Sequence, residues 1–436
     1  MRPRAVAPQK HRWFDQFLIP RTGTPLQRMA DEVRVDLAKH EAEAGSRVRK
    51  RKAIDQARHD AAVSLAIANL AYMVLNKSDT GRLAVNVRRL GFEKTRYDNP
   101  ALGVTFRKNV EAPLEDMGML VFEYSKTRGF RGEASSIVPT QAFADRVAQA
   151  GISLADFTRD TEELILLDQV EYTDTPITNA YRATLRSINA FLDASDIGFL
   201  DDNGPVVDPY RRTLRRHFKV YKGEAPSFNK DGRLFGGFWE NLKADRRTHI
   251  RISGEPIAIL DFSSMFPRLA YTKLGLTPPD GDLYALDDLP SGYRSGIKLA
   301  TNTFFFDHSK HRSVWPKVMG VGVGTDEDAK DPMHPAAQYD GLLPAGWTVG
   351  RTRQAILQRH PAFRKLHGKS VGHQLMFIES EVMIAVLTEL QSRNVVALPL
   401  HDGLLVARSK AEEAMCVMGT QSKKVTGVQL PVARKA

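Results

Sequence analysis

Cysteine is almost absent from the sequence, since Cys416 is the single one among 436 residues. One cysteine excludes an intramolecular disulfide framework and any cysteine-rich zinc or iron–sulfur site. No apolar run approaches the ~18 residues that a membrane span requires. The start, MRPRAVAPQKHRW, is basic but lacks the apolar core of a secretory signal. We therefore expect a cytoplasmic protein with no membrane partner, in a bacterial, phage or plasmid setting.

What the sequence does contain is an excess of basic residues. Lys and Arg number 62 against 51 Asp and Glu, which gives a formal net charge of +11. Hydrophobic residues make up 42% and charged residues 26%, the usage of ordinary globular proteins, which excludes disorder for most of the chain. The basic excess favours a polyanionic partner, most often nucleic acid.

The chain divides into two regions near the Asp/Gly/Pro-rich stretch 201–209. Residues 1–209 are expected to be mainly helical, with helices over the first ~75 residues and over 138–200, one of them opening at Ser153. The basic run 47–52 indicates a solvated helix face, a phosphate-contacting surface or, third, a nuclear localisation signal. The segment 210–219 is either a surface helix or a contact to a nucleic-acid backbone through its arginines, Arg211, Arg212, Arg215 and Arg216.

Two aspartates in the second region stand at the ends of apolar segments. Asp261 follows the strand-like run 256–260, and Asp402 lies at the turn of a predicted hairpin, LPLHDGLLV. Each could simply cap its turn. Two carboxylates that meet across a sheet instead repel unless cations neutralise them, and Mg²⁺ prefers one or two carboxylates together with substrate phosphates. The pattern therefore predicts a two-metal site.

A predicted helix over about 292–306 carries a third set of candidate residues on one face, because its members are four residues apart. Its Arg and Lys can hold a triphosphate, and an aromatic ring beyond them can meet a base. The alternative is an amphipathic helix with a polar stripe. The set consists of Arg294, Lys298, Asn302 and Phe306.

These three blocks, taken in order, resemble the palm of a polymerase. Residues 261–268, DFSSMFPR, look like motif A, residues 294–306 look like the motif B helix, and LPLHDGLLV looks like motif C. The pattern is that of family A DNA polymerases and the single-subunit phage-type RNA polymerases. Upstream, Gly232-Arg233-Leu234 with Asn241-Leu242 resembles the family A segment that contacts the primer–template. The resemblance covers roughly 230–410.

The departures from that pattern are specific. Family A enzymes usually carry Glu after the motif C Asp, whereas this chain has Gly403. Motifs A and B also echo family B, but the Asp-Thr-Asp of family B is absent. The interval from Asp261 to Lys298 is short, so the fingers, placed at about 272–350, are expected to be reduced. No proofreading exonuclease motif is recognised.

The resemblance implies an α+β fold with a right-hand-like palm and fingers over 210–436, and a thumb and template-binding role for 1–209. It implies that Asp261 and Asp402 bind two Mg²⁺ ions, with Mn²⁺ as an alternative. Lys298 would grip the triphosphate and protonate the leaving pyrophosphate. The residues that would bind nucleotide are Arg294, Lys298, Asn302, Phe306 and Phe266, and those that would bind nucleic acid include Arg233 and His401.

The expected activity is DNA synthesis from dNTPs on a primer–template by a monomer. A bulky ring at Phe266 would exclude a ribose hydroxyl, and Phe306 stands where the phage-type RNA polymerases carry Tyr. Phe266 could also be core beneath the palm. The rivals are an RNA polymerase or primase of the same superfamily, a non-catalytic nucleic-acid-binding protein with a decayed palm and, more remotely, a two-metal nuclease.

Overall fold

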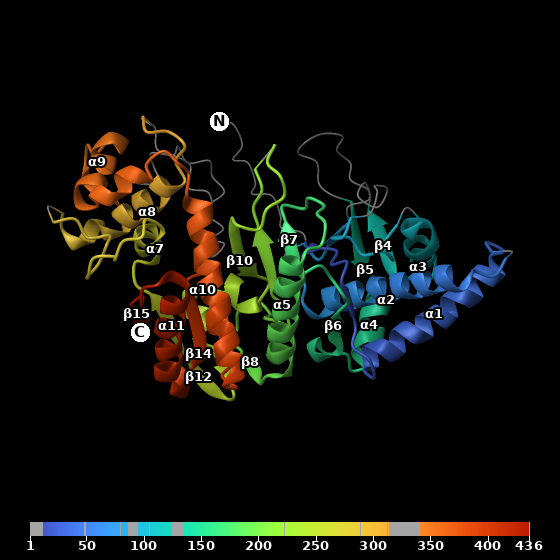
Figure 1. The fold of residues 1–436 in the computed structure, drawn as a ribbon. Coiled ribbons are helices and arrows are strands. Elements are labelled where there is room, and N and C mark those ends of the chain that lie inside the picture. The colour runs from blue at the N-terminus through green and yellow to red at the C-terminus, as the bar shows by residue number, and fades with distance from the viewer. Residues whose placement is uncertain are drawn as a thin grey trace, which may run out of the picture. The chain divides into compact units, whose positions relative to one another are not determined.

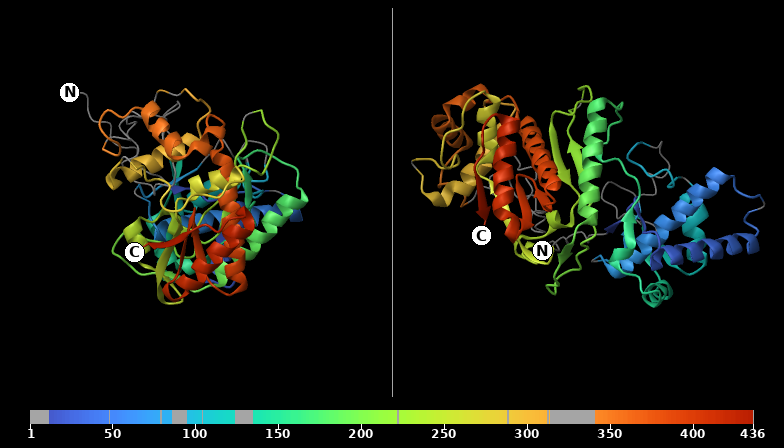
Figure 2. Two further views of the ribbon diagram at one scale, coloured as in Figure 1. Left: turned by 60° about the vertical axis from the view of Figure 1, so that its left-hand side comes forward. Right: turned by 60° about the horizontal axis from the view of Figure 1, so that its bottom comes forward.

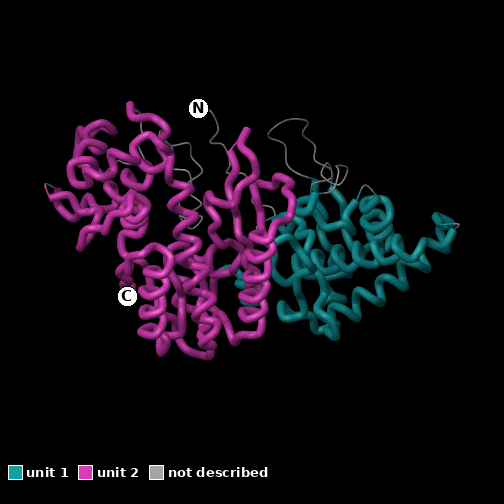
Figure 3. The backbone as a smooth tube through the Cα atoms, in the orientation of Figure 1, with its two compact units in different colours: residues 1–163, 205–210 teal, residues 164–204, 211–436 magenta. Residues whose placement is uncertain are grey.

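The structure is a computed structural model, and it describes residues 12–435 except 48, 79, 86–94, 104, 124–134, 222, 288, 312 and 314–340. The chain forms two compact units, residues 1–163 with 205–210 and residues 164–204 with 211–436 (Figure 3). The sequence placed the division at 209/210. The division differs because the strands β7 (Ile165–Leu167) and β8 (Ile197–Phe199) pair with strands of the second unit.

The first unit combines two long helices with short strands. Helix α1 (Pro25–Glu43) begins after Thr24, whose hydroxyl accepts a hydrogen bond from the Gln27 amide. Helix α2 (Ala53–Leu75) is buried along most of its second half, and both helices confirm the helical prediction for the first ~75 residues. A four-stranded sheet has the order β1-β3-β5-β4. The remaining elements are β1 (Arg12–Trp13), β2 (Leu18–Pro20), β3 (Leu83–Ala84), η2 (Arg107–Glu111), α3 (Ala112–Asp116), β4 (Leu120–Glu123), β5 (Ser136–Pro139), α4 (Gln141–Gln149), η3 (Leu154–Asp156) and β6 (Phe157–Arg159).

The prediction of helices throughout 138–200 is partly wrong. Helices α4 and α5 (Pro176–Ala194) are present, but Ser153 precedes a single 3-10 turn rather than a helix. The strands β6 and β7 follow that turn, and they pair with β2 and β9 (Arg215–Phe218). Pairing with strands far away in the sequence therefore overrides the local helical pattern.

A six-stranded sheet forms the centre of the second unit. Its order is β13-β14-β12-β11-β8, with β15 paired to β12 as well. A three-stranded sheet, β10-β9-β7, lies in the same unit. The predicted strand at 256–260 and the predicted hairpin around Asp402 are both confirmed. The strands are β10 (Asp231–Phe235), β11 (Ile250–Ile252), β12 (Glu255–Phe262), β13 (Ala397–Leu400), β14 (Gly403–Ala407) and β15 (Val432–Lys435).

Two helices run side by side against these sheets (Figures 1 and 2). Helix α10 (Gly372–Ser392) packs against β10 and against α11 (Ala411–Thr426). It agrees with the long helix that the sequence of about 374–393 predicts. The indole of Trp239 is fully buried and donates to the Pro399 carbonyl at 2.7 Å. This bond ties η4 (Phe238–Asn241) to β13. The short helix α6 (Ala244–Arg247) and the turn η9 (Arg408–Lys410) complete this part.

A helical group follows β12 in the chain (Figure 1). It contains α7 (Met265–Lys273), η5 (Ser291–Tyr293), α8 (Arg294–Phe305), α9 (Val349–Arg359) and η8 (Pro361–Lys365). Helix α8 confirms the helix predicted at about 292–306. A Cβ on its Gly296 would lie 1.9 Å from the Leu342 carbonyl, so the close approach requires glycine. The Gly/Asp/Pro-rich composition of 316–348 predicts an exposed insertion, and most of that segment lies outside the described residues.

Among the described helices, none is both long and apolar enough to cross a membrane. The mixture of helices and sheets agrees with the α+β class that the sequence predicts.

Candidate active site

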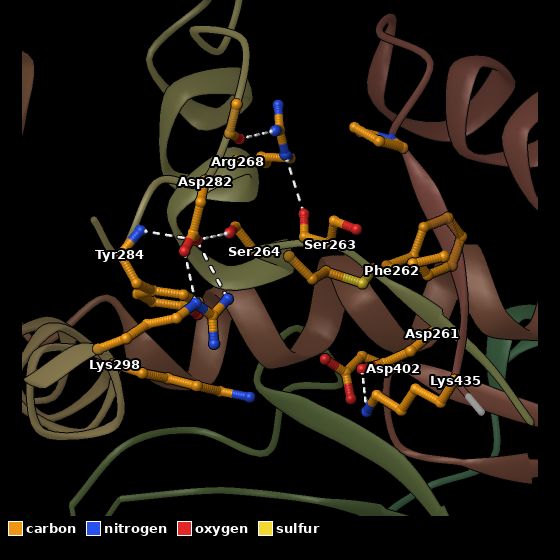
Figure 4. A pocket seen from close by; sticks show the side chains of 15 residues that line it. Asp261, Phe262, Ser263, Ser264, Arg268, Asp282, Tyr284, Lys298, Asp402 and Lys435 are labelled. Atoms are coloured by element: carbon orange, nitrogen blue, oxygen red, sulfur yellow. Dashed lines mark hydrogen bonds and ion pairs between the residues drawn. The ribbon is translucent and has the colours of Figure 1, made fainter. Parts of the chain in front are cut away.

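The central sheet brings Asp261 and Asp402 to one place. Strand β12 pairs antiparallel with β14, and Asp261 lies opposite Gly403 in that register. The amide of Phe262 donates to the Asp402 carbonyl at 3.1 Å. The end of the strand and the turn of the hairpin therefore meet, and both carboxylates line one cavity of about 560 Å³ (Figure 4).

The backbone around the hairpin turn leaves no room for a side chain at residue 403, directly after Asp402. A Cβ on Gly403 would lie 2.7 Å from the Leu260 carbonyl and 3.2 Å from Oδ1 of Asp261. His401 takes a positive φ of 55°, which closes the turn. The Glu that family A enzymes usually carry at the position of Gly403 is thus excluded here by the backbone itself.

The charge of Asp261 is costly in this environment. Burial and then the negative charge of Asp402 raise the pKa of Asp261 to about 6, against the opposing effects of Lys435 and Lys298. Lys435 reaches this carboxylate from β15, which pairs with β12, and forms an ion pair with it. A cation is therefore already placed beside one of the two carboxylates.

Two cations of α8 also line the cavity. Arg294 is engaged by Asp282, with Nη2 3.1 Å from Oδ1. Lys298 has no acidic partner among the described residues, and Figure 4 shows its side chain extending toward the two carboxylates. The ring of Tyr284 is close to both, with its centroid 5.4 Å from the Arg294 guanidinium and 5.9 Å from the Lys298 ammonium. Lys298 is thus the better placed of the two to meet a phosphate.

The loop between α7 and α8 contributes residues that the sequence did not indicate. Asp282 accepts from the Ser264 hydroxyl at 3.0 Å and from the Tyr284 amide at 3.1 Å. The buried guanidinium of Arg268 donates to the carbonyls of Ser263, Pro279 and Gly281, and this fixes the loop against the end of β12. Arg268 lay within the motif A segment, whereas Asp282 and Lys435 carried no recognisable sequence signal.

Three predicted nucleotide-binding residues do not line this cavity. Phe266 is 7% exposed and stacks on Phe306, with centroids 6.2 Å apart. Phe306 in turn covers Gly372, where a Cβ would lie 2.5 Å from its ring. Asn302 is buried and accepts from the Tyr284 hydroxyl at 3.2 Å. In this structure these side chains serve packing, because protein atoms already occupy their faces.

Arg233 is buried and His401 is half-buried. Arg233 donates from Nε and Nη2 to Oε1 and Oε2 of the buried Glu379, at 2.7 and 3.0 Å. Burial raises the pKa of Glu379 to about 7 although Arg233 opposes this. Burial, followed by the charge of Arg233, lowers the pKa of His401 to about 4. The Arg233 expected to touch the primer terminus is therefore a buried ion-pair partner.

The basic segment at 210–219 also needs correction. Arg212 is buried and donates to the carbonyls of Leu192, Ser195 and Ile197, which places it at the C-terminal end of α5. Arg216 is 1% exposed and donates to the Gly232 carbonyl at 2.8 Å. Arg216 points into the protein because β9 turns alternate residues inward, whereas Arg212 lies before β9 and is held by the carbonyls at the end of α5. Neither side chain can therefore bind a nucleic-acid backbone in this structure. Of the other two arginines, Arg211 is exposed and Arg215 is half-buried.

The donor set for a metal ion consists of two carboxylates. Within the described residues, no group of three or more His, Cys, Asp and Glu side chains could hold a metal ion. A pair of aspartates still fits Mg²⁺, which keeps several waters and takes substrate phosphates as further ligands.

Comparison with known proteins gives one distant structural likeness. No family model and no curated protein matches the chain. Among solved structures, the chain is similar to the polymerase domain of Pol1 from M. smegmatis in complex with DNA primer–template and dNTP. The identity is 11%, the match covers 94% of this chain and 68% of that chain, and the TM-score is 0.28. A TM-score this low carries no weight for function.

Proposed function

We propose that the protein is a template-directed nucleotidyltransferase that extends a primer with dNTPs by a two-Mg²⁺ mechanism. The observation that carries the proposal is the cavity shared by Asp261, Asp402 and Lys298. Two carboxylates and an unpaired ammonium form the minimum set for binding a metal-complexed triphosphate. The motif order in the sequence supports the same assignment.

Asp261 and Asp402 are the residues that would hold the metal ions. The fit is supported by the ion pair of Lys435 with Asp261, because it marks a position where a cation is favoured. It is supported also by the raised pKa of Asp261: burial and then the charge of Asp402 disfavour the carboxylate, and a bound cation would offset both effects. When bound, Mg²⁺ would activate the attacking hydroxyl and offset the charge that develops on the phosphate oxygens.

Lys298 would bind the β- and γ-phosphates and donate a proton from Nζ to the leaving pyrophosphate. In the reaction, the primer 3′-hydroxyl loses its proton to solvent and its oxygen forms a bond to the α-phosphorus, while the bond from that phosphorus to pyrophosphate breaks. Arg294 would join Lys298 only after exchanging Asp282 for a phosphate, because Asp282 holds its guanidinium in the structure. Asp282 and Arg268 would position the loop that forms this wall of the cavity.

The preference for deoxynucleotides rests on the stacked pair of Phe266 and Phe306. Neither ring lines the cavity, so either would act on the incoming sugar only through an exposed edge. An RNA polymerase or primase is the main alternative. Incorporation of rNTPs by the wild-type protein would support that alternative. Incorporation of rNTPs by Phe266→Ala alone would support exclusion of ribose by this ring.

Two other functions make different predictions. A non-catalytic nucleic-acid-binding protein is supported by Gly403, where the backbone excludes the usual Glu. It predicts duplex binding that survives Asp402→Ala, and no primer extension. A nuclease would also use paired aspartates, but it binds no triphosphate and so does not need the ammonium of Lys298 beside them.

The test is a labelled primer–template incubated with dNTPs or rNTPs and Mg²⁺. We expect extension by the wild type and its loss in Asp261→Ala and Asp402→Ala. Asp287→Ala is the control, because Asp287 is an exposed carboxylate on the loop between α7 and α8 that does not line the cavity. Extension that persists in both site variants would refute the proposal.

A further inference from the structure

A second cavity lies within the first unit, at the N-terminal end of α2. Its volume is about 540 Å³, within the range of small-ligand pockets. Its lining is dominated by cations from the basic run and the first turns of the helix. They are Arg47, Arg49, Lys50, Arg51, Lys52 and Arg58.

Two of these cations serve the fold. Arg47 and Arg51 both bind Glu41 of α1, with Arg51 Nη1 2.8 Å and Arg47 Nε 3.2 Å from Oε2. Burial would raise the pKa of Glu41, but the hydrogen bond and charge of Arg51 outweigh it and leave that pKa lowered. The Glu41 carboxylate thus fixes the connection between α1 and α2, which carries the other basic residues that line the cavity.

The other four cations have no acidic partner among the described residues. These are Arg49, Lys50, Lys52 and Arg58, and each is exposed. Asp55 is the one carboxylate among the lining residues, so it compensates only part of their charge. Like charges gathered around a concave surface attract anions, because the low-dielectric wall strengthens their field.

The lining of the cavity adds one further feature that favours an anion. The N-cap residue of α2, Lys52, makes no side-chain capping bond, so the first amides of this long helix point outward unpaired by a cap. His59 also lines the cavity, but the protein holds both ring nitrogens: Nε2 lies 3.2 Å from the Asn109 carbonyl, and Nδ1 lies 3.7 Å from Oδ1 of Asp60. Phe106, which is buried, supplies an apolar wall.

We propose that this cavity binds a linear polyphosphate group, as carried by a nucleoside triphosphate or by the 5′-triphosphate end of a nucleic-acid strand. The four lining cations without an acidic partner among the described residues match the charge of a triphosphate. The concave shape suits a compact anion better than an extended backbone with one charge per nucleotide. The site is separate from the one formed by Asp261 and Asp402, so it would bind ligand whether or not the proposed polymerase activity exists.

The experiment measures binding of a fluorescent ATP analogue by polarisation, in EDTA and with the Lys298→Ala protein to remove the other cavity's contribution. Unlabelled tripolyphosphate should compete. Lys52→Met and Arg58→Met should each weaken binding about tenfold, as expected for the loss of one charge-assisted hydrogen bond. Lys39→Met is the matched control, because Lys39 is an exposed lysine of α1 outside the cavity.

Competitors then separate the sources of the phosphate. Competition by ATP but not by a 5′-triphosphorylated oligonucleotide identifies a free nucleotide as the ligand. Competition by that oligonucleotide that is stronger than by ATP identifies a strand end. Equal competition by the same oligonucleotide with a 5′-hydroxyl would overturn the proposal in favour of backbone binding. Equal binding by Lys52→Met, Arg58→Met and Lys39→Met, or failure of tripolyphosphate to compete, would overturn it as well.

Discussion

Replacing Lys435 with Met removes the ammonium that pairs with Asp261 and leaves the backbone pairing of β15 with β12 intact. If Asp261 is a metal ligand, Lys435 competes with the metal for it. We therefore expect Lys435→Met to bind Mg²⁺ more tightly than the wild type.

The size of this effect follows from the exposure of the pair. Two unit charges 4 Å apart interact by about 4 kcal/mol at an effective dielectric constant of 20. The Lys435 side chain is 58% exposed and that of Asp261 is 17% exposed, so solvent screens much of this interaction. Exposed ion pairs contribute about 0.2–1 kcal/mol. The upper value corresponds to about a fivefold increase in Mg²⁺ affinity, since 1.4 kcal/mol is a factor of ten.

Calorimetric titration with Mg²⁺ at pH 7.5 measures this change. Arg434→Met is the matched control, because it removes a positive charge from the same strand at the neighbouring position, whose side chain points to the opposite face. A thermal melt confirms that both variants fold. Mg²⁺ affinity in Lys435→Met that is equal to or lower than in Arg434→Met would refute the competition between Lys435 and the metal.

Three further predictions follow from buried groups. Because the pKa of Asp261 is raised to about 6, Mg²⁺ affinity measured by calorimetry should fall about tenfold per pH unit below pH 6 and level off above it. A Mg²⁺ affinity that does not change between pH 5 and 7 would contradict the assignment. Without metal, the Asp261 carboxyl lowers the free energy of unfolding as pH rises from about 4 to 6. Glu379→Gln should lower the urea unfolding free energy by about 3–5 kcal/mol, because it leaves Arg233 buried and unpaired, whereas Glu389→Gln on the exposed side of the same helix should have no measurable effect. Gly403→Ala should lower the free energy of unfolding by about 1–3 kcal/mol in the same assay, because the new Cβ would meet the Leu260 carbonyl. Gly198→Ala should leave it unchanged, because a Cβ there meets no atom within 4 Å. Equal stability of the two variants would show that the hairpin relaxes.

Local pattern alone identified the elements on which the site is built. The apolar run ending at Asp261, the hairpin around Asp402 and the helix carrying Lys298 all follow from short-range periodicity. Segment 153–167 was misread as helical, because its strands are stabilised by partners that lie more than 40 residues away.

Only the tertiary structure decided what each charged residue contacts. The sequence shows that Arg212, Arg216 and Arg233 are basic, but a charge run does not reveal which side chains turn inward. In the folded protein, Arg212 and Arg216 are buried and donate hydrogen bonds to backbone carbonyls, and Arg233 forms an ion pair with Glu379. Likewise, Lys435 reaches Asp261 only because β15 joins the edge of β12. Periodicity is a property of neighbours in the chain, whereas charge pairing depends on neighbours in space, so the sequence determined the elements and the packing decided their partners.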